Sequence, residues 1–321
     1  MRLGTLSGLL VTVLALAACS GSNDAGGEAA HGKESGPSRG DATTAEEVAR
    51  QARGKVKCPA RISTPPRGEG APVDDVVGVR PGMTYDEAVN VVLCSHDLLV
   101  VEQDDMRAFQ IQAFGQKLRH GFNARFAAPP KTSEQIIAEM QDRATARGNN
   151  QVIEDMQPGQ SKWYVATIGL PGQERVLSAA REEWFAADRY PTLASVQKAL
   201  IDKYGQPTDA HAEQNYQTKT YRMQWRRDAR QQPAAEGRCA TGADPDSATN
   251  YSPDCGISVA ANLRQRADNP DLVEFLQVSV IDKAGGYAAI VATEQGLESL
   301  DAERRAAQLQ QAEKNSDAPT L

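Results

Sequence analysis

The chain has 321 residues, a formal net charge of −7 and only 5% aromatic residues. An acidic chain without a block of lysines and arginines excludes a nucleic-acid-binding protein, because contacts to phosphates dominate the affinity of that class. The low aromatic content also means that a hydrophobic core must rely on valine, leucine, isoleucine and alanine. The length is enough for one large domain or two ordinary ones.

Residues 1–18 have the pattern of a secretory signal. One charged residue, Arg2, precedes an apolar stretch from Leu9 to Leu16, which is shorter than the ~20 apolar residues of a membrane span. The sequence Leu16-Ala17-Ala18-Cys19 resembles the lipobox of bacterial lipoproteins, in which the signal is cut before the cysteine and the cysteine is acylated. The resemblance implies that Cys19 carries palmitate-type acyl chains, and several such chains anchor a protein stably. The alternative is an ordinary cleaved signal with an incidental cysteine.

The residues after the lipobox indicate where the chain is held. Ser20 follows the lipobox cysteine, so the aspartate that directs inner-membrane retention in enteric-type sorting is absent. We therefore expect a protein anchored to the outer membrane and facing the periplasm. Residues 19–55 are predicted to be the acylated N-terminus and a flexible tether, because most of this stretch lacks large apolar residues and cannot bury enough surface to fold. Near its end, Thr44 and Glu47 have the spacing of a capping box and predict a short helix.

Four cysteines remain apart from the lipobox cysteine, and an even number in an oxidising compartment predicts disulfides. Cys239 and Cys255 bracket a turn-rich loop between two strand-like runs, so we expect them to form one pair. Cys58 and Cys94 then form the other. The alternative makes Cys58, Cys94 and His96 zinc ligands, but zinc sites usually show two tight pairs of ligands and only one is present here.

The patterns that follow predict an α+β protein with antiparallel sheets and packed helices, arranged as two similar subdomains. The first subdomain is expected at residues 56–150, the second at 151–295, and a polar C-terminal helix or tail at 296–321. Alternating or β-branched runs predict strands, and amphipathic periodicity predicts helices. The predicted strands are 98–102, 107–115, 162–170, 174–185, 219–227, 255–264 and 273–282, and the predicted helices start near residues 84, 131 and 191.

Two of these helices share a pattern. Thr84 and Glu87 form a capping-box pair at the first, and Thr192 starts the second. Small or aliphatic residues follow both threonines at matching steps. This similarity suggests an internal duplication, although helical periodicity alone could also produce it.

The stretch from Gly82 through Met83 and Thr84, with Glu87 after it, resembles the opening motif of the SmpA/OmlA (BamE-like) lipoproteins. The Gly-x-Pro that closes that family's motif is missing from the first subdomain, and Gly205 and Pro207 supply it only in the second. The resemblance implies an outer-membrane lipoprotein with a small α+β fold that acts by binding other envelope proteins. It also implies that Gly82, Met83, Thr84 and Glu87 belong to a partner-binding helix.

One pattern suggests catalysis. Ser195 and Lys198 form an S-x-x-K at a helix start, and Lys283-Ala284-Gly285 follows a strand. Penicillin-binding enzymes use such elements to place a lysine beside a serine nucleophile. The S-x-N element between them is missing, and the predicted buried face of the helix excludes Lys198. A periplasmic serine hydrolase using Ser195 and Lys198 is therefore the alternative hypothesis, and we expect no catalytic residue.

The loop between Cys239 and Cys255 carries oxygen-bearing side chains that could suit Ca²⁺, namely Asp244, Asp246, Asn250 and Asp254. Its spacing lacks the glycine and glutamate of an EF-hand, so an acidic solvated loop is the preferred interpretation. The sequence thus predicts no metal and no cofactor. It predicts a non-catalytic, membrane-anchored periplasmic lipoprotein that binds envelope proteins in envelope assembly or maintenance, with small-ligand binding as a further alternative.

Overall fold

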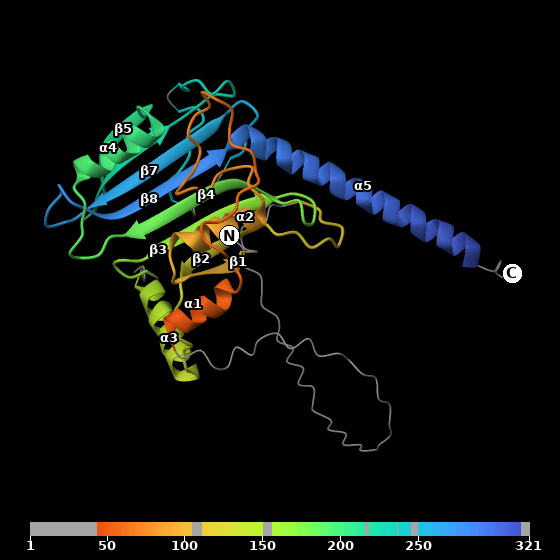
Figure 1. Ribbon diagram of the computed structural model, residues 1–321, viewed down its shortest axis with the longest axis horizontal. Helices are drawn as coiled ribbons and strands as arrows, with labels where there is room; N and C mark the ends of the chain where they lie inside the picture. The colour runs from red at the N-terminus through yellow and green to blue at the C-terminus, as the bar shows by residue number, and fades with distance from the viewer. Residues whose placement is uncertain are drawn as a thin grey trace, which may run out of the picture. The chain divides into compact units, whose positions relative to one another are not determined.

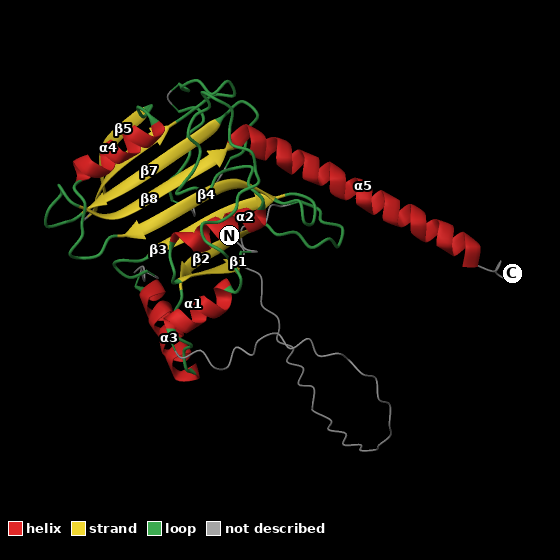
Figure 2. Cartoon of the chain, viewed as in Figure 1, coloured by secondary structure: helices red, strands yellow, loops and turns green. Residues whose placement is uncertain are grey.

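Eight antiparallel strands form one continuous sheet, shown in yellow in Figure 2. The computed structural model describes residues 44–104, 111–149, 156–215, 218–235, 237–244 and 250–315. The strand order is β1-β2-β3-β4-β8-β7-β6-β5 (Figure 1). The strands are β1 (Leu99–Gln103), β2 (Gly121–Phe126), β3 (Ser161–Ile168), β4 (Arg175–Trp184), β5 (Asp209–Asn215), β6 (Thr218–Trp225), β7 (Ile257–Gln265) and β8 (Val273–Asp282).

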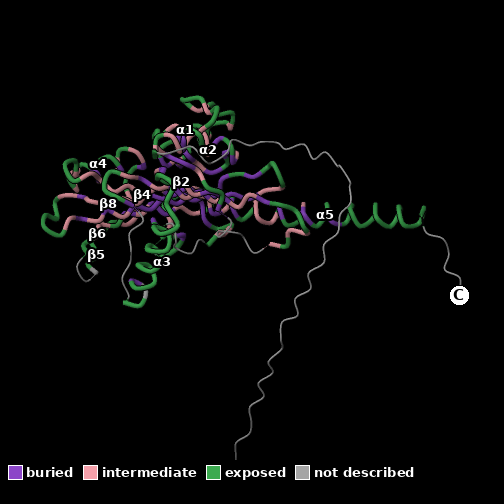
Figure 3. Tube along the Cα trace, turned by 90° about the horizontal axis from the view of Figure 1, so that it is seen from below, coloured by how far each residue is buried: buried purple, intermediate pink, exposed green. Residues whose placement is uncertain are grey.

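Five helices accompany the sheet, so the predicted α+β class with an antiparallel sheet is confirmed. Figure 3 shows α2 and α4 on one side of the sheet and α3 on the other. Among the described helices, none combines the length and the apolar character that a membrane span requires. The helices are α1 (Ala45–Arg53), α2 (Tyr85–Ser95), α3 (Ser133–Gly148), α4 (Leu193–Tyr204) and α5 (Lys283–Asn315).

The hydrophobic core lies between the sheet and the two helices α2 and α4. Tyr85 of α2 meets Phe122 edge-on with ring centroids 5.3 Å apart. Tyr204 of α4 lies against Trp225 at the same centroid distance. Side chains alternate between the two faces of a strand, and those that point toward α2 and α4 are nearly all apolar. They include Phe122, Trp163, Val165, Met223, Trp225, Val259 and Leu263.

The strands pair across the predicted subdomain boundary at residue 150. Phe122 of β2 is opposite Val165 of β3, and one core cluster includes residues from both predicted subdomains. Ala42–Leu321 therefore belong to a single unit. The predicted signal peptide, the lipobox with Cys19 and most of the predicted tether lie outside the described residues.

The predicted helix starts are confirmed by their hydrogen bonds. Thr44 and Glu47 form a reciprocal capping box at α1, and Thr84 and Glu87 form another at α2. Thr192 caps α4 by accepting a hydrogen bond from the Ser195 backbone N–H at 3.1 Å. These caps satisfy backbone donors that a helix start leaves without a partner.

Three segments differ from the prediction. The second strand is β2 at residues 121–126 rather than 107–115, part of which lies outside the described residues. β5 was not predicted, because its sequence DAHAEQN has only alanine as an apolar residue. The C-terminal helix begins at Lys283, ahead of the predicted start at residue 296, because the Asp282 side chain caps it by accepting from the Gly285 N–H at 2.9 Å.

Candidate functional site

Both predicted disulfides are present. Cys58 is bonded to Cys94 at 2.07 Å, and Cys239 is bonded to Cys255 at 2.02 Å. The zinc alternative is therefore wrong, because its two thiolate ligands are consumed by the first disulfide. His96 instead stacks on Phe126, with ring centroids 4.4 Å apart.

The motif resembling the BamE-like family contributes mainly to folding. Met83 is only 1% exposed and lies in the core, while Gly82 has a left-handed φ of 88° that leads the chain into α2. The Glu87 carboxylate accepts hydrogen bonds from the backbones of Ser63, Thr64 and Thr84. Burial alone would raise the pKa of Glu87, but these bonds and those from the Ser63 and Thr64 hydroxyls lower it well below its usual range. Met83 and Glu87 are thus buried beneath the surface.

Ser195 and Lys198 are not brought together. The Ser195 hydroxyl donates to the Thr192 carbonyl at 2.8 Å, and the Lys198 ammonium is paired with Asp202 at 2.5 Å on an exposed face of α4. Lys283 has a different, structural role. Its ammonium is buried and donates to the carbonyls of Ala240 and Asn250. That burial lowers the pKa of Lys283. The elements of the hydrolase alternative therefore have separate structural explanations.

The loop between Cys239 and Cys255 covers part of the sheet face that points away from α2 and α4. The Ser258 hydroxyl donates to the Cys239 carbonyl at 3.0 Å, and the Ser279 hydroxyl donates to the Gly242 carbonyl at 2.6 Å. Asp246 lies outside the described residues. Within the described ranges there is no group of three or more His, Cys, Asp or Glu side chains that could hold a metal ion.

Beside this loop, six polar residues stand opposite one another across six adjacent strands. We call them the polar row. Their neighbours in sequence, such as Trp163, Ala261 and Met223, belong to the core, so by alternation the row lies on the opposite face. At about 4.8 Å between strands, the row spans about 24 Å. Its members are Lys162, Glu182, Gln277, Asn262, Arg222 and His211, in the order of strands β3, β4, β8, β7, β6 and β5.

The centre of the polar row is held by hydrogen bonds between its own side chains. Asn262 Nδ2 donates to Gln277 Oε1 at 3.0 Å, and Gln277 Nε2 donates to Glu182 Oε1 at 2.8 Å. The Tyr164 hydroxyl donates to the other oxygen of Glu182 at 3.2 Å. Partial burial raises the pKa of Glu182, against the opposing effect of these hydrogen bonds. The amides and the carboxyl group are therefore fixed in position.

An aromatic cluster borders the polar row on the side away from the disulfide loop. Trp184 and Phe275 meet edge-on with ring centroids 6.4 Å apart. The Arg264 guanidinium lies over the Phe275 ring, 4.6 Å from its centroid, and is also bound to Glu274 at 2.8 Å. Such contacts restrict the motion of all three side chains, so this border of the row is also rigid.

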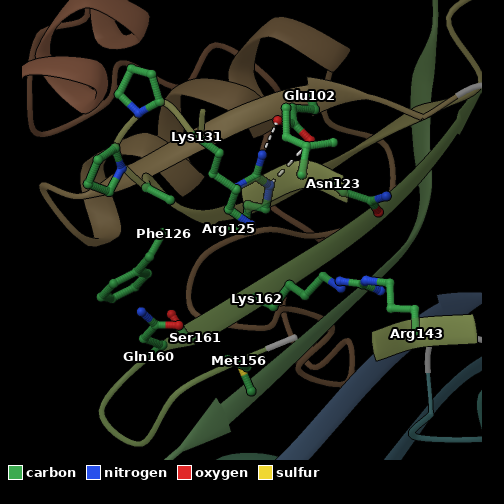
Figure 4. A pocket seen from close by; sticks show the side chains of 14 residues that line it. Glu102, Asn123, Arg125, Phe126, Lys131, Arg143, Met156, Gln160, Ser161 and Lys162 are labelled. Atoms are coloured by element: carbon green, nitrogen blue, oxygen red, sulfur yellow. Dashed lines mark hydrogen bonds and ion pairs between the residues drawn. The ribbon is translucent and has the colours of Figure 1, made fainter. Parts of the chain in front are cut away.

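At its β3 end the polar row continues into a groove of about 600 Å³. The groove lies between the sheet and α3, and Figure 4 shows the side chains of Lys162 and Arg143 extended toward each other from β3 and α3. Arg125 of β2 is bound to Glu102 of β1 at 2.7 Å on its floor. Its remaining lining includes Phe126, Pro129, Pro130, Lys131, Ile136 and Met156.

Helix α3, which forms one wall of the groove, is exposed along almost its whole length. Residues 131–145 are all exposed, including Ile136, Ile137 and Met140 at 47%, 55% and 66%. A capping box between Thr132 and Gln135 defines its start. A helix of this length is only marginally stable without packing, so its apolar side chains favour a further contact.

Sequence reasoning predicted the strands that carry the polar row, apart from β5, but not the row itself. The row depends in addition on which strands are neighbours and in what register, and the β4–β8 pair joins segments almost a hundred residues apart.

Comparisons of the chain with protein-family models, with curated proteins and with solved structures gave no match. The polar row and the groove are therefore the features that bear on function.

Proposed function

We propose that this chain is a non-catalytic lipoprotein, anchored by Cys19 to the outer membrane and facing the periplasm, that binds an envelope protein in envelope assembly or maintenance. The lipobox resemblance supports the anchor. The binding role rests on one structural observation: a fixed row of polar side chains crosses the sheet face opposite the core and continues into a basic groove.

A polar sheet face is not by itself a binding site, because antiparallel sheets commonly have one solvated face. This face differs in that Glu182, Gln277 and Asn262 are half-buried and bonded to one another rather than extended into water. Side chains that are already fixed lose little freedom when a partner binds, which favours affinity. An interface of ordinary size needs about 800 Å² on each partner, and a strip about 24 Å long beside a groove can supply such an area.

A small ligand is the alternative occupant of the groove, because about 600 Å³ is within the range of small-molecule sites. Such sites are mostly apolar and enclose their ligand. This groove is instead lined by several charged side chains and opens onto the polar row, which favours an extended partner.

We also propose that the chain consists of two similar halves. Each half has a helix capped by a threonine, Thr84 or Thr192, followed by four antiparallel strands. The last strand of each half, β4 or β8, lies at the centre of the sheet, where the two strands pair. The polar row crosses this junction from Glu182 to Gln277, so both halves contribute to one binding surface.

Site-specific photocrosslinking in intact cells tests the binding role. Crosslinking amino acids are placed at Tyr164 and Arg222, which lie beside and in the polar row, and at Ala199, which is exposed on α4 on the opposite face. We expect the first two positions to capture the same envelope protein repeatedly and Ala199 not to capture it. Equal capture from all three positions, or capture of abundant porins alone, would contradict the proposal.

Metabolic labelling tests the anchor separately. We expect radiolabelled palmitate to be incorporated into the wild-type chain and not into the Cys19→Ser variant. Label retained in that variant would show that the lipid is attached elsewhere or that the signal is of the ordinary cleaved kind.

A further inference from the structure

The groove has the opposite charge to the chain as a whole. Its described lining contains four cationic side chains, Arg125, Lys131, Arg143 and Lys162, and one carboxylate, Glu102. The cations come from β2, the loop after it, α3 and β3, so they surround the groove rather than line one strand. In a chain with a net charge of −7, this concentration of positive charge selects for an acidic ligand.

Two of these cations already bind carboxylates. Arg125 Nη2 lies 2.7 Å from Glu102 Oε1, and Lys131 Nζ lies 2.7 Å from Glu139 Oε2. Lys162 differs, because it forms no ion pair with the described residues. Its ammonium lies over the Tyr164 ring, 5.1 Å from the centroid, where the polar row meets the groove. Lys162 is thus the cation best placed to receive a carboxylate from another molecule.

The groove also has apolar lining. Ile136 of α3 lines it together with Phe126, at the end of β2, and Met156. The exposed Ile137 and Met140 continue this apolar surface along the helix. Exposed apolar side chains grouped in this way mark interaction sites, because covering them removes apolar surface from water. The ligand that fits must therefore carry apolar side chains as well as carboxylates.

We propose that the groove receives a segment of the protein partner in which aspartate or glutamate residues are interspersed with large apolar residues. A carboxylate of this segment binds Lys162, and its apolar side chains pack on Ile136 and Met140. This inference rests on the proposed function and specifies the chemistry of its partner. A phosphate polymer has no apolar side chains for Ile136 and Met140 of α3, and cations that surround a groove from several elements are unsuited to the flat surface of a membrane.

Zero-length carbodiimide coupling in intact cells tests this chemistry, because it joins a lysine amine only to a carboxylate or phosphate in direct contact. The full anchored chain is used, and the products are mapped by mass spectrometry. We expect Lys162 to be joined to an aspartate or glutamate of the protein that the Tyr164 crosslinker captures. Lys219, an exposed lysine on β6, is the control and should not be joined to that protein.

The other outcomes overturn the inference. Coupling of Lys162 to a phosphate, to a second copy of this chain, or only to carboxylates of its own chain would each show that no acidic partner segment lies there. If the photocrosslinkers at Tyr164 and Arg222 still capture an envelope protein in that case, the proposed function stands and only the groove's ligand is wrong. If they capture none, the proposed function fails.

Matched variants add a test that does not depend on coupling yield. Lys162→Arg keeps the charge and removes the amine, so we expect the coupled product to disappear while capture from Arg222 falls less than with Lys162→Glu. Lys162→Glu reverses the charge, and capture should fall about tenfold. Replacing the exposed Ile136 and Met140 together by serine should reduce capture several-fold, whereas Glu134→Ser on the same helix should not. Unchanged capture with Lys162→Glu, or with the double serine variant, would overturn the inference.

Discussion

Replacing Glu87 by glutamine should lower the free energy of unfolding by about 3 kcal/mol. The carboxylate accepts from two backbone N–H groups at Ser63 and Thr64, from both of their hydroxyls, and from the Thr84 N–H. Hydrogen bonds to a charged group contribute about 1.5–3 kcal/mol each and neutral ones about 1 kcal/mol. Glutamine keeps one acceptor oxygen but turns an NH₂ toward the buried Thr84 N–H, so several bonds weaken and one donor loses its partner.

The chain contains a control for this prediction. Thr44 and Glu47 form the same capping box at α1, but those bonds are exposed. We expect Glu47→Gln to cost only about 0.5–1 kcal/mol, in the range of an exposed cap. Both values are measured by denaturant unfolding of the full chain at pH 7. Similar costs for the two variants would refute the argument that the bonds to Ser63 and Thr64 hold this region.

The pH dependence gives the same prediction an independent check. The hydrogen bonds hold the folded pKa of Glu87 below that of an unfolded glutamate, which is about 4.3. Its contribution to stability is therefore fully present above about pH 4.3 and is lost as the pH falls toward the folded pKa. The difference between wild type and Glu87→Gln should shrink on acidification below about pH 4. A difference that stays constant from pH 7 to pH 2 would contradict the assignment.

Three further predictions concern stability. Gly286→Ala should cost at least 2 kcal/mol of folding stability, roughly the penalty for overpacking a buried site, because the new Cβ would overlap the Tyr251 ring. Gly148→Ala has open space at its Cβ and should be neutral or slightly stabilising. Equal melting temperatures for the two variants would contradict this prediction. Replacing Cys58 and Cys94 by serine should lower the free energy of unfolding by about 4 kcal/mol. The same replacement at Cys239 and Cys255 should lower it by about 3 kcal/mol, because the first pair closes the longer loop. The reverse order in denaturant unfolding would refute the loop-length argument. Glu182→Gln should raise stability at pH 7, because burial raises the pKa of Glu182 and its charge opposes folding above the unfolded pKa. The gain should diminish as the pH falls toward about 4.3 and be absent below it, and a gain that grows on acidification would contradict the sign.

The elements that could be predicted from the sequence are those specified by local signals. The capping boxes at Thr44 and Thr84 fix helix starts through side chains three residues apart, and both are present. The cysteine pairs followed from an even count and from the turn-rich stretch between Cys239 and Cys255. Most strands were recognised because one of their faces is apolar.

The elements that could not be predicted depend on contacts distant in sequence. The helix α5 has two glycines in its first turn, Gly285 and Gly286, which disfavour a helix, and Gly286 is there because the Tyr251 ring occupies the space of a side chain. β5 is an exposed edge strand, so it needs no apolar face. The polar row exists only once β4 lies beside β8, and the groove only once Ile136 and Arg143 of α3 lie near β2 and β3; neither arrangement has a local signal.

The position of β8 at the centre of the sheet has a consequence for folding. β4 pairs on one side with β3, its neighbour along the chain, and on the other with β8. Until residues 273–282 have been synthesised, β4 therefore has an unpaired edge, which is a site for mispairing between chains. Bringing β8 to β4 closes a loop of almost a hundred residues, which is slow compared with forming the β3–β4 and β7–β8 hairpins. The time between synthesis of β4 and of β8 is thus the period in which the nascent chain is most exposed to mispairing, and chains interrupted before residue 273 should aggregate rather than accumulate as a half-sheet.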